Sequence, residues 1–270
     1  MTLSTKEKQR LKTNYGPWAV VTGATSGIGL ELAMQLAQSG LNLVINARNG
    51  NQLATVAANI KRLYGVEVLE VAADLATKQG TDELINKTKH LPVGLFVASA
   101  GFGTSGVFIQ NSVDDEVNML RVNCEAVLVL THHFGQQFAQ QKRGGIILLS
   151  SLVAFQGVPF AANYAATKAY IQTLAEGLHV ELKPFGVDVL AVAPGPVESG
   201  FGARANMKMN GALKPGQLGV PVLKALGRKA TVLPGFLSKF LIYSLATLPR
   251  WGKVKAMKAV MGGMTKHQRD

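Results

Sequence analysis

The chain has 270 residues, 47% of them hydrophobic, a single cysteine (Cys124) and a formal net charge of +12. This composition is typical of one large globular domain; it excludes an intrachain disulfide framework and argues against a thiolate metal site, so we expect no bound metal. The basic N-terminus lacks the apolar stretch of a secretory signal, and no uncharged apolar run of about 18 residues predicts a membrane-spanning helix.

Short apolar runs alternate with longer amphipathic segments up to Val192, as when strands and helices follow one another along a chain. The runs predict strands at residues 18–22, 41–47, 66–71, 93–98, 145–150 and 187–192. The segments between them predict helices at residues 27–39, 52–63, 82–89, near 113–141 and at 161–183. This order predicts an α/β fold, a Rossmann-type doubly wound parallel sheet of about seven strands with helices on both faces.

The pattern changes after Val197. Residues 198–214 lack a clear period and contain several glycines and methionines, which predicts a mobile substrate loop. We then expect a short helix, a final strand and two amphipathic helices with basic faces at residues 215–226, 229–233, 235–248 and 251–261. No repeat or linker divides the chain, so we predict one domain over residues 1–270, with an N-terminal leader (1–14) and a small helical C-terminal extension.

The excess positive charge lies entirely in this last part. Residues 1–200 contain 15 Lys and Arg against 15 Asp and Glu, whereas residues 201–270 contain 13 against the single acid Asp270. Such asymmetry is typical of a surface for an anionic substrate, an anionic membrane or a nucleic acid, and equally of a solvated basic face. Because the C-terminal part has no nucleic-acid-binding module, we expect no nucleic acid partner. We predict a cytoplasmic protein and keep peripheral membrane contact as a hypothesis.

A glycine-rich turn, TGATSGIG at Thr22–Gly29, joins the first predicted strand to the first helix. Its three glycines allow a sharp turn and a close approach to a pyrophosphate, and the helix N-terminus offers free N–H groups. Because the turn lies between a strand and a helix, it predicts a dinucleotide site. The candidate residues are Gly23, Thr25, Ser26, Gly27, Ile28 and Gly29.

The end of the second strand indicates which dinucleotide is bound. An NAD site usually has an acidic residue there for the ribose hydroxyls, but this chain has Ala47 followed by Arg48. A guanidinium can bind a 2′-phosphate through two hydrogen bonds. We therefore favour NADP(H) as the cofactor, with NAD(H) as the alternative if Arg48 is only a solvated arginine.

Tyr164 and Lys168 are four residues apart in a predicted helix and therefore share one face. Ser151 directly follows a buried strand, where parallel sheets build their sites. Taken singly, each residue is also typical of helix packing or of a strand-end cap. Jointly, beside the glycine-rich turn, the three predict an acid–base centre.

Together these features resemble the short-chain dehydrogenase/reductase family. The matching segments occur in the family's order over about residues 15–200 and are Thr22–Gly29, Asp74-Leu75, Ser99-Ala100-Gly101, Asn123, Ser151, Tyr164 with Lys168, and Pro194-Gly195. Residues 15–21 (YGPWAVV) also resemble the branch with 17β-hydroxysteroid dehydrogenases and 3-oxoacyl reductases. The resemblance implies an NADP-dependent oxidoreductase that acts on CH–OH donors and forms a homodimer or homotetramer.

The resemblance also implies catalytic roles. Tyr164 is expected to protonate the substrate carbonyl oxygen, while the cofactor supplies a hydride. The Lys168 ammonium is expected to lower the pKa of Tyr164 and to hold the nicotinamide ribose. Ser151 is expected to hydrogen-bond the carbonyl oxygen, and Asn123 to hold a water that links Lys168 to solvent.

Further cofactor contacts are implied by the same resemblance. Asp74 and Leu75 are expected on the adenine side. Ser99 departs from the family pattern, which has asparagine there, and this puts a local structural role in doubt more than the reaction. The remaining implied contacts are Ala100, Gly101, Tyr164, Lys168, Pro194, Gly195, Val197 and Ser199.

Apolar residues in the segments around this centre predict an apolar ketone, aldehyde or 3-oxoacyl chain as substrate, although ordinary core or dimer packing would also explain them. The candidate substrate contacts are Ser151, Phe155, Phe160, Tyr164 and Phe201. Three other functions remain open: an NADP-binding regulatory or scaffold protein without turnover, a nucleic acid binder, and a dehydratase or epimerase. The intact Ser151, Tyr164 and Lys168 favour the reductase.

Overall fold

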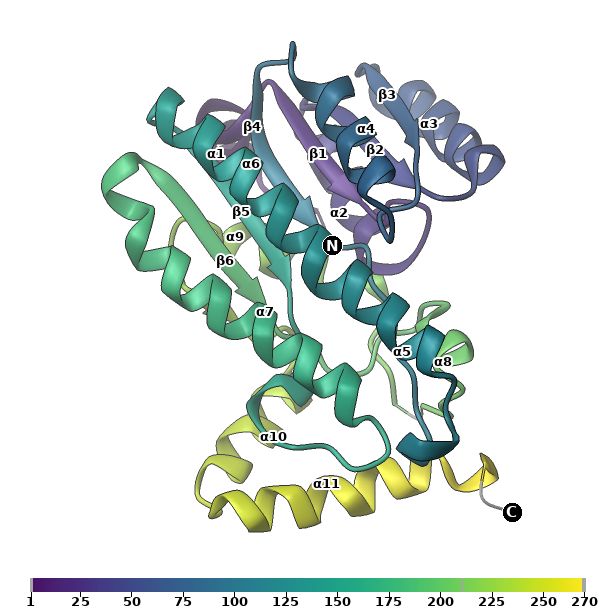
Figure 1. Cartoon of the computed structure of the whole chain (residues 1–270). Coiled ribbons are helices and arrows are strands. Elements are labelled where there is room, and N and C mark those ends of the chain that lie inside the picture. The colour runs from purple at the N-terminus through teal and green to yellow at the C-terminus, as the bar shows by residue number, and fades with distance from the viewer. Residues whose placement is uncertain (1, 210, 269–270) are drawn as a thin grey trace.

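The computed structural model describes residues 2–209 and 211–268 and contains one open parallel sheet (Figure 1). Its seven strands have the order β3-β2-β1-β4-β5-β6-β7, and every neighbouring pair is parallel. The strands are β1 (Trp18–Thr22), β2 (Asn42–Ala47), β3 (Val68–Ala72), β4 (Val93–Ala98), β5 (Gly144–Leu149), β6 (Val187–Val192) and β7 (Thr231–Val232). The predicted doubly wound sheet is confirmed, and its strand order reverses between β1 and β4, where such sheets bind ligands.

Helices cover both faces of the sheet because alternate strand residues point to opposite sides. On one face, Leu36 and its neighbours pack against strand residues such as Val21. The helices there are α1 (Thr5–Tyr15), α2 (Gly27–Gln38), α3 (Gly50–Tyr64) and α9 (Gly219–Ala225). On the other face, the ring of Phe134 stacks on Phe96 of β4 with 4.7 Å between ring centres. The helices there are α4 (Lys78–Thr88), α6 (Ala126–Gln141) and α7 (Ala162–Glu181).

Residues 2–14, which we expect to form an N-terminal leader of the domain, pack against the sheet. Most of them form α1, and its residues Leu11 and Tyr15 are fully buried. The Tyr15 hydroxyl donates a hydrogen bond of 2.7 Å to the carboxylate of Asp188, the second residue of β6. Arg10 donates to the carbonyl oxygen of Leu223 in α9 at 2.7 Å. Helix α1 is therefore bonded to β6 and α9, two elements that come more than 170 residues later in the sequence.

The helix predicted near residues 113–141 is interrupted. It consists of α5 (Val113–Leu120), a π-helical turn at Arg121–Glu125, and α6. Such single-turn π segments are frequent at functional sites. Here the turn contains the buried Asn123, whose side chain reaches the loop that follows β4.

The region after β6 extends beyond the carboxyl ends of the strands. The expected irregular loop contains one short helix, α8 (Phe201–Arg204), and a parallel bridge between Val197 and Leu213. Two further helices, α10 (Phe236–Ala246) and α11 (Arg250–Met264), lie at the bottom of Figure 1. Over the described parts of the chain, no helix is both long enough and apolar enough to cross a bilayer.

Candidate active site

A cavity of about 1030 Å³ lies at the carboxyl ends of the strands. Its wall runs from the glycine-rich turn after β1 to the two C-terminal helices, so a nucleotide-sized cleft and an apolar chamber form one space. The structure brings every predicted cofactor residue to this wall: Gly23, Thr25, Ser26, Gly27, Ile28, Gly29, Arg48, Asp74, Leu75, Ser99, Ala100, Gly101, Tyr164, Lys168, Pro194, Gly195, Val197 and Ser199.

The turn after β1 requires glycine at particular positions. Gly23 has a φ of +65°, and a Cβ there would lie 2.8 Å from the Cα of Ala100. A Cβ at Gly29 would collide with the carbonyl oxygen of Gly23. Ser26 precedes α2 but makes no side-chain cap, so the N–H groups of the first helical turn remain available to an anion. The turn therefore fits the pyrophosphate of a dinucleotide.

The departure at Ser99 is accommodated by Thr22, the last residue of β1. The Thr22 hydroxyl oxygen accepts hydrogen bonds of 3.1 Å from the backbone N–H groups of both Ser99 and Ala100. It also donates to the carbonyl of Val97 at 3.4 Å. Thr22 of the neighbouring strand β1 therefore holds the backbone of the loop after β4. This support does not depend on the side chain at position 99.

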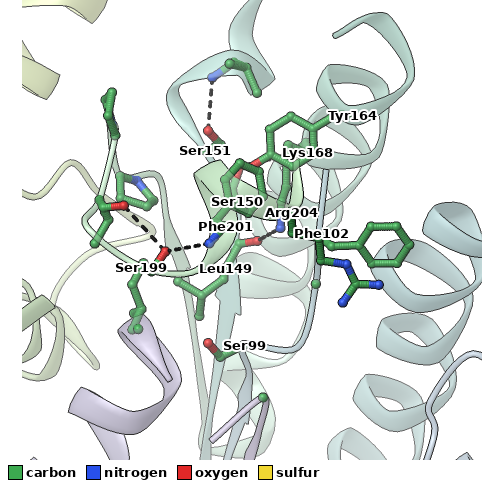
Figure 2. A pocket seen from close by; sticks show the side chains of 18 of the residues that line it. Ser99, Phe102, Leu149, Ser150, Ser151, Tyr164, Lys168, Ser199, Phe201 and Arg204 are labelled. Atoms are coloured by element: carbon green, nitrogen blue, oxygen red, sulfur yellow. Dashed lines mark hydrogen bonds between the residues drawn. The ribbon is translucent and has the colours of Figure 1, made fainter. Parts of the chain in front are cut away.

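Charged groups gather where β2 and β3 end. Arg48 and Asp74 lie on the cavity wall directly after these strands. Arg204 of α8, which the motif analysis missed, approaches from the opposite loop, with its guanidinium carbon 3.9 Å from the centre of the Phe102 ring (Figure 2). Burial and the like charge of Arg48 lower the pKa of Arg204. The two cations thus repel each other, and an anion bound near both would relieve that repulsion.

Tyr164 and Lys168 lie one turn apart on the buried face of α7 (Figure 2). The Lys168 Nζ is 5.9 Å from the centre of the Tyr164 ring and donates a hydrogen bond of 2.7 Å to the carbonyl oxygen of Leu149. Ser150 donates to the carbonyl oxygen of Lys168 at 3.1 Å. These contacts join α7 to the end of β5 and fix the lysine beside the tyrosine.

The acid–base properties of the pair differ from the sequence-based expectation. Burial raises the pKa of Tyr164 to about 12, although a hydrogen bond with Ser151 acts in the opposite direction. Burial also lowers the pKa of Lys168 to about 8. The direction is thus opposite to the expected lowering: desolvation dominates, and the group that lowers the pKa of Tyr164 is Ser151, not Lys168. A phenol with a raised pKa is fully protonated at neutral pH, so Tyr164 holds the proton that a reduction needs. It is a weak acid until a nearby positive charge stabilises its phenolate.

Ser151 follows β5 and begins the 3-10 turn Leu152–Phe155. Its Oγ accepts a hydrogen bond of 3.4 Å from the backbone N–H of Val153, which orients the side chain. Accepting this bond leaves the hydroxyl hydrogen to be donated either to the Tyr164 oxygen or to a substrate oxygen. Ser151 and Tyr164 can therefore both direct a donor toward one oxygen atom in the cavity.

Asn123 is not on the cavity wall. Its Oδ1 accepts from the backbone N–H of Phe102 at 3.1 Å, and its Nδ2 donates to the Phe102 carbonyl at 2.8 Å and to the Thr167 hydroxyl at 3.1 Å. The side chain of Asn123 is thus occupied by protein partners, and the water that Asn123 is expected to hold stays a prediction. Asn123 clamps the loop after β4 onto α7, next to Lys168, and acts here as a positioning residue.

The loop after β6 packs against the glycine-rich turn. A Cβ at Gly27 would lie 2.9 Å from the Cβ of Ser199, so the two loops approach as closely as glycine permits. The Ser199 hydroxyl accepts from the backbone N–H of Phe201 at 3.4 Å. This bond orients the start of α8, which carries Phe201 and Arg204 into the cavity.

Of the expected substrate contacts, Ser151, Tyr164 and Phe201 line the cavity, with the Phe201 and Tyr164 ring centres 5.1 Å apart. Phe155 and Phe160 are not among its lining residues, which corrects that part of the prediction. The reason is the conformation of the loop after β5, which decides which of its side chains face the cavity. Its turn presents Leu152 and Val153 to the cavity instead, and no periodicity in the sequence defines that conformation.

The motif analysis missed the C-terminal wall of the cavity. Met257, Met261 and Met264 of α11 face it, together with Ile242 and Leu245 of α10. Met207 and Met209, from the methionine-containing segment predicted as a substrate loop, line the cavity beside them. The four-residue spacing of Met257 and Met261 is a helix-face signal that could have been read from the sequence. Flexible thioether side chains allow this wall of the cavity to change shape.

The family model for short chain dehydrogenases matches residues 17–210. The chain therefore belongs to the short-chain dehydrogenase family and is an oxidoreductase of that family, as its motifs predicted.

Relatives with related names support this placement. A very-long-chain 3-oxoacyl-CoA reductase-like protein of Arabidopsis thaliana is 36% identical over 191 residues, which cover 69% of this chain and 61% of that protein. The chain thus spans less than two thirds of this relative's length. A solved structure described in a study of 7beta-hydroxysteroid dehydrogenase stereoselectivity superposes with a TM-score of 0.85 at 26% identity, over 92% of this chain and 98% of the other.

The cofactor choice made from Arg48 is also supported. A short-chain dehydrogenase from Sphingobium yanoikuyae, solved in complex with NADPH, has a TM-score of 0.79 and 26% identity over 87% of this chain and 97% of the other. NADP(H) therefore agrees with both the sequence and the solved relatives.

Proposed function

We propose that the chain is an NADP(H)-dependent reductase that interconverts a bulky apolar carbonyl compound and its alcohol, with Tyr164 as general acid and base. The main observation in support is that Ser151, Tyr164 and Lys168 line one cavity. They line it together with the glycine-rich turn and with the methionines of α11 and of the loop after β6. An apolar ketone, an aldehyde or a 3-oxoacyl chain is compatible with this chamber because its lining side chains are mostly apolar. The test is an NADPH-oxidation screen over ketones, aldehydes, quinones, steroids and 3-oxoacyl thioesters.

The residues divide the reaction between them. NADPH, when bound, supplies the hydride that reduces the carbonyl carbon. Ser151 donates a hydrogen bond to the carbonyl oxygen and stabilises its developing charge. Tyr164 transfers its phenolic proton to that oxygen, and the Lys168 ammonium stabilises the phenolate that remains. Hydride on carbon and proton on oxygen together give the alcohol, and the reverse transfers oxidise it.

We expect the reduction rate to be level near neutral pH and to fall above about pH 8. Burial lowers the pKa of Lys168 to about 8, so its charge is lost from there upward, while Tyr164, with a pKa of about 12, keeps its proton. A kcat/KM profile for a non-ionising ketone measures this. Lys168→Arg, which stays charged, should remove the decline if it folds. A wild-type profile that is flat to pH 9.5 would contradict the role.

Arg48→Asp is expected to raise the KM for NADPH at least about tenfold and to leave the KM for NADH nearly unchanged, because a charge-assisted contact to a 2′-phosphate contributes ~1.5–3 kcal/mol. Calorimetric binding of 2′,5′-ADP against 5′-ADP reports the same contact without turnover. Arg62→Asp on α3, with the same charge change outside the cavity, is the control. Arg204→Leu should weaken 2′,5′-ADP binding as well. Equal losses for both nucleotides would refute the assignment.

A regulatory or scaffold protein that binds NADP without turnover is the alternative. It would show the same nucleotide binding but no stoichiometric loss of NADPH absorbance with any substrate of the screen. The intact group of Ser151, Tyr164 and Lys168 supports the enzyme, because a binding role alone requires no proton donor in the chamber.

We further propose that the chain forms a homodimer or homotetramer through α5, α6 and α7. Exposed apolar side chains there surround a shallow hollow, among them Val117, Leu120, Leu128 and Tyr170. Such a patch favours a second copy of the chain. Light scattering that shows a monomer at micromolar concentration would contradict this.

A further inference from the structure

The hairpin of α10 and α11 has two faces of different character. Its inner face closes the apolar end of the cavity through Ile242, Leu245, Met257, Met261 and Met264. Its outer face is directed away from the sheet and forms the lower boundary of the molecule in Figure 1. The same two helices therefore border both the chamber and the surroundings.

The outer face exposes large apolar side chains on α10, on the connection between the helices and on α11. Tyr243 is 68% exposed and Trp251 is 72% exposed, while Phe240 and Leu248 expose 58% and 41%. Phe240 and Tyr243 are three residues apart and therefore share one face of α10. Four large apolar side chains are thus exposed along the two helices and their connection, and exposed apolar surface of this kind is typical of a binding surface.

Basic side chains alternate with these apolar ones. Lys255 and Lys258 follow Trp251 at spacings of four and seven residues, so the three form one exposed stripe along α11. Lys239 and Arg250 add charge beside Phe240 and Trp251. The sequence has no Asp or Glu between Glu198 and Asp270, so no acidic residue of this region neutralises the stripe.

We propose that the outer face of the α10–α11 hairpin binds the surface of an anionic lipid bilayer, from which an apolar substrate enters the cavity behind the same helices. The substrate part of this proposal rests on the proposed reductase function. Interfacial helices bind in this way, with aromatic rings at the headgroup level and lysines at anionic lipids. A second copy docked on this face would place like charges against each other, which disfavours a symmetric dimer here.

Co-sedimentation with vesicles tests the surface directly. The full chain, without substrate, is mixed with vesicles of phosphatidylcholine alone or with a third of phosphatidylserine. We expect binding to the anionic vesicles only, and its loss at high salt. Lys255→Glu/Lys258→Glu should weaken this binding at least about tenfold, and Trp251→Ala should weaken it at constant charge. Neither lysine lines the cavity, so NADPH binding should be unchanged.

The matched control is Lys87→Glu/Lys89→Glu, which makes the same charge change at exposed positions at the end of α4. In Figure 1 this helix lies at the upper part of the molecule, far from α11. The control should bind anionic vesicles like the wild type. Equal loss in both double variants, no wild-type binding, or preferred binding to duplex DNA would overturn the proposal.

Substrate entry needs a second measurement. For a ketone that partitions into the bilayer, Lys255→Glu/Lys258→Glu should raise the apparent KM in anionic vesicles, with no change for a freely soluble ketone. If the variant and the wild type have equal apparent KM values for the membrane-partitioning ketone in anionic vesicles, the entry route is overturned. If the chain binds vesicles but reduces no ketone at all, the reductase function fails and the membrane surface stands.

Discussion

Tyr164→Phe is expected to lower kcat for carbonyl reduction by about 10²–10⁴-fold, the usual contribution of a positioned general acid. The substitution removes the phenolic hydroxyl and its proton. The ring that lies 5.1 Å from Phe201 remains, and so does the hydrogen bond between Lys168 and the Leu149 carbonyl. NADPH binding, followed by fluorescence titration, should therefore stay within about twofold of the wild type.

Tyr170→Phe is the control for this change. Tyr170 lies on the same helix α7 but is 38% exposed and outside the cavity wall, so its loss of a hydroxyl should leave kcat unchanged. Single-turnover kinetics separates the chemical step from product release. If Tyr164→Phe retains turnover within a fewfold of the wild type, another group donates the proton.

Ser151→Ala is expected to lower kcat by about 10²–10³-fold, as the loss of one oxyanion-stabilising donor does elsewhere. The same change removes the cap on the Val153 N–H, which contributes about 1 kcal/mol to stability. The two effects are separable because the first appears in kcat and the second in the free energy of unfolding.

Ser112→Ala provides the matched comparison for Ser151→Ala. Ser112 caps α5 by accepting a hydrogen bond of 3.4 Å from the Asp115 N–H, and it does not line the cavity. It should lose a similar amount of stability with no loss of kcat. A fall in kcat that merely follows the loss of stability in both variants would show that Ser151 has only a structural role.

The sheet could be predicted from the sequence because its strands are buried on both faces and appear as apolar runs. The nucleotide cleft could be predicted because the carboxyl ends of neighbouring parallel strands meet, so Gly23, Arg48 and Ser151 converge from distant segments. Tyr164 and Lys168 join them because a four-residue spacing puts both on the inner face of one helix.

The remaining features depend on tertiary packing. Arg204 reaches the nucleotide cleft only because α8 folds across the loop after β4, and nothing in its local sequence indicates that. Burial of Tyr164 and Lys168 shifts their pKa values up and down respectively, and burial cannot be read from a spacing. The chamber wall from α10 and α11 follows from how these helices dock, which a helical pattern alone leaves undetermined.

Transfer of deuterium from NADPH labelled at the reactive position of the nicotinamide tests the central claim most directly. With a bulky apolar ketone from the screen, the account predicts one deuterium on the carbinol carbon per NADPH consumed, and loss of this product in Tyr164→Phe. NADPH binding without any labelled alcohol, over the whole panel of ketones, aldehydes and 3-oxoacyl thioesters, would contradict it and favour the regulatory alternative.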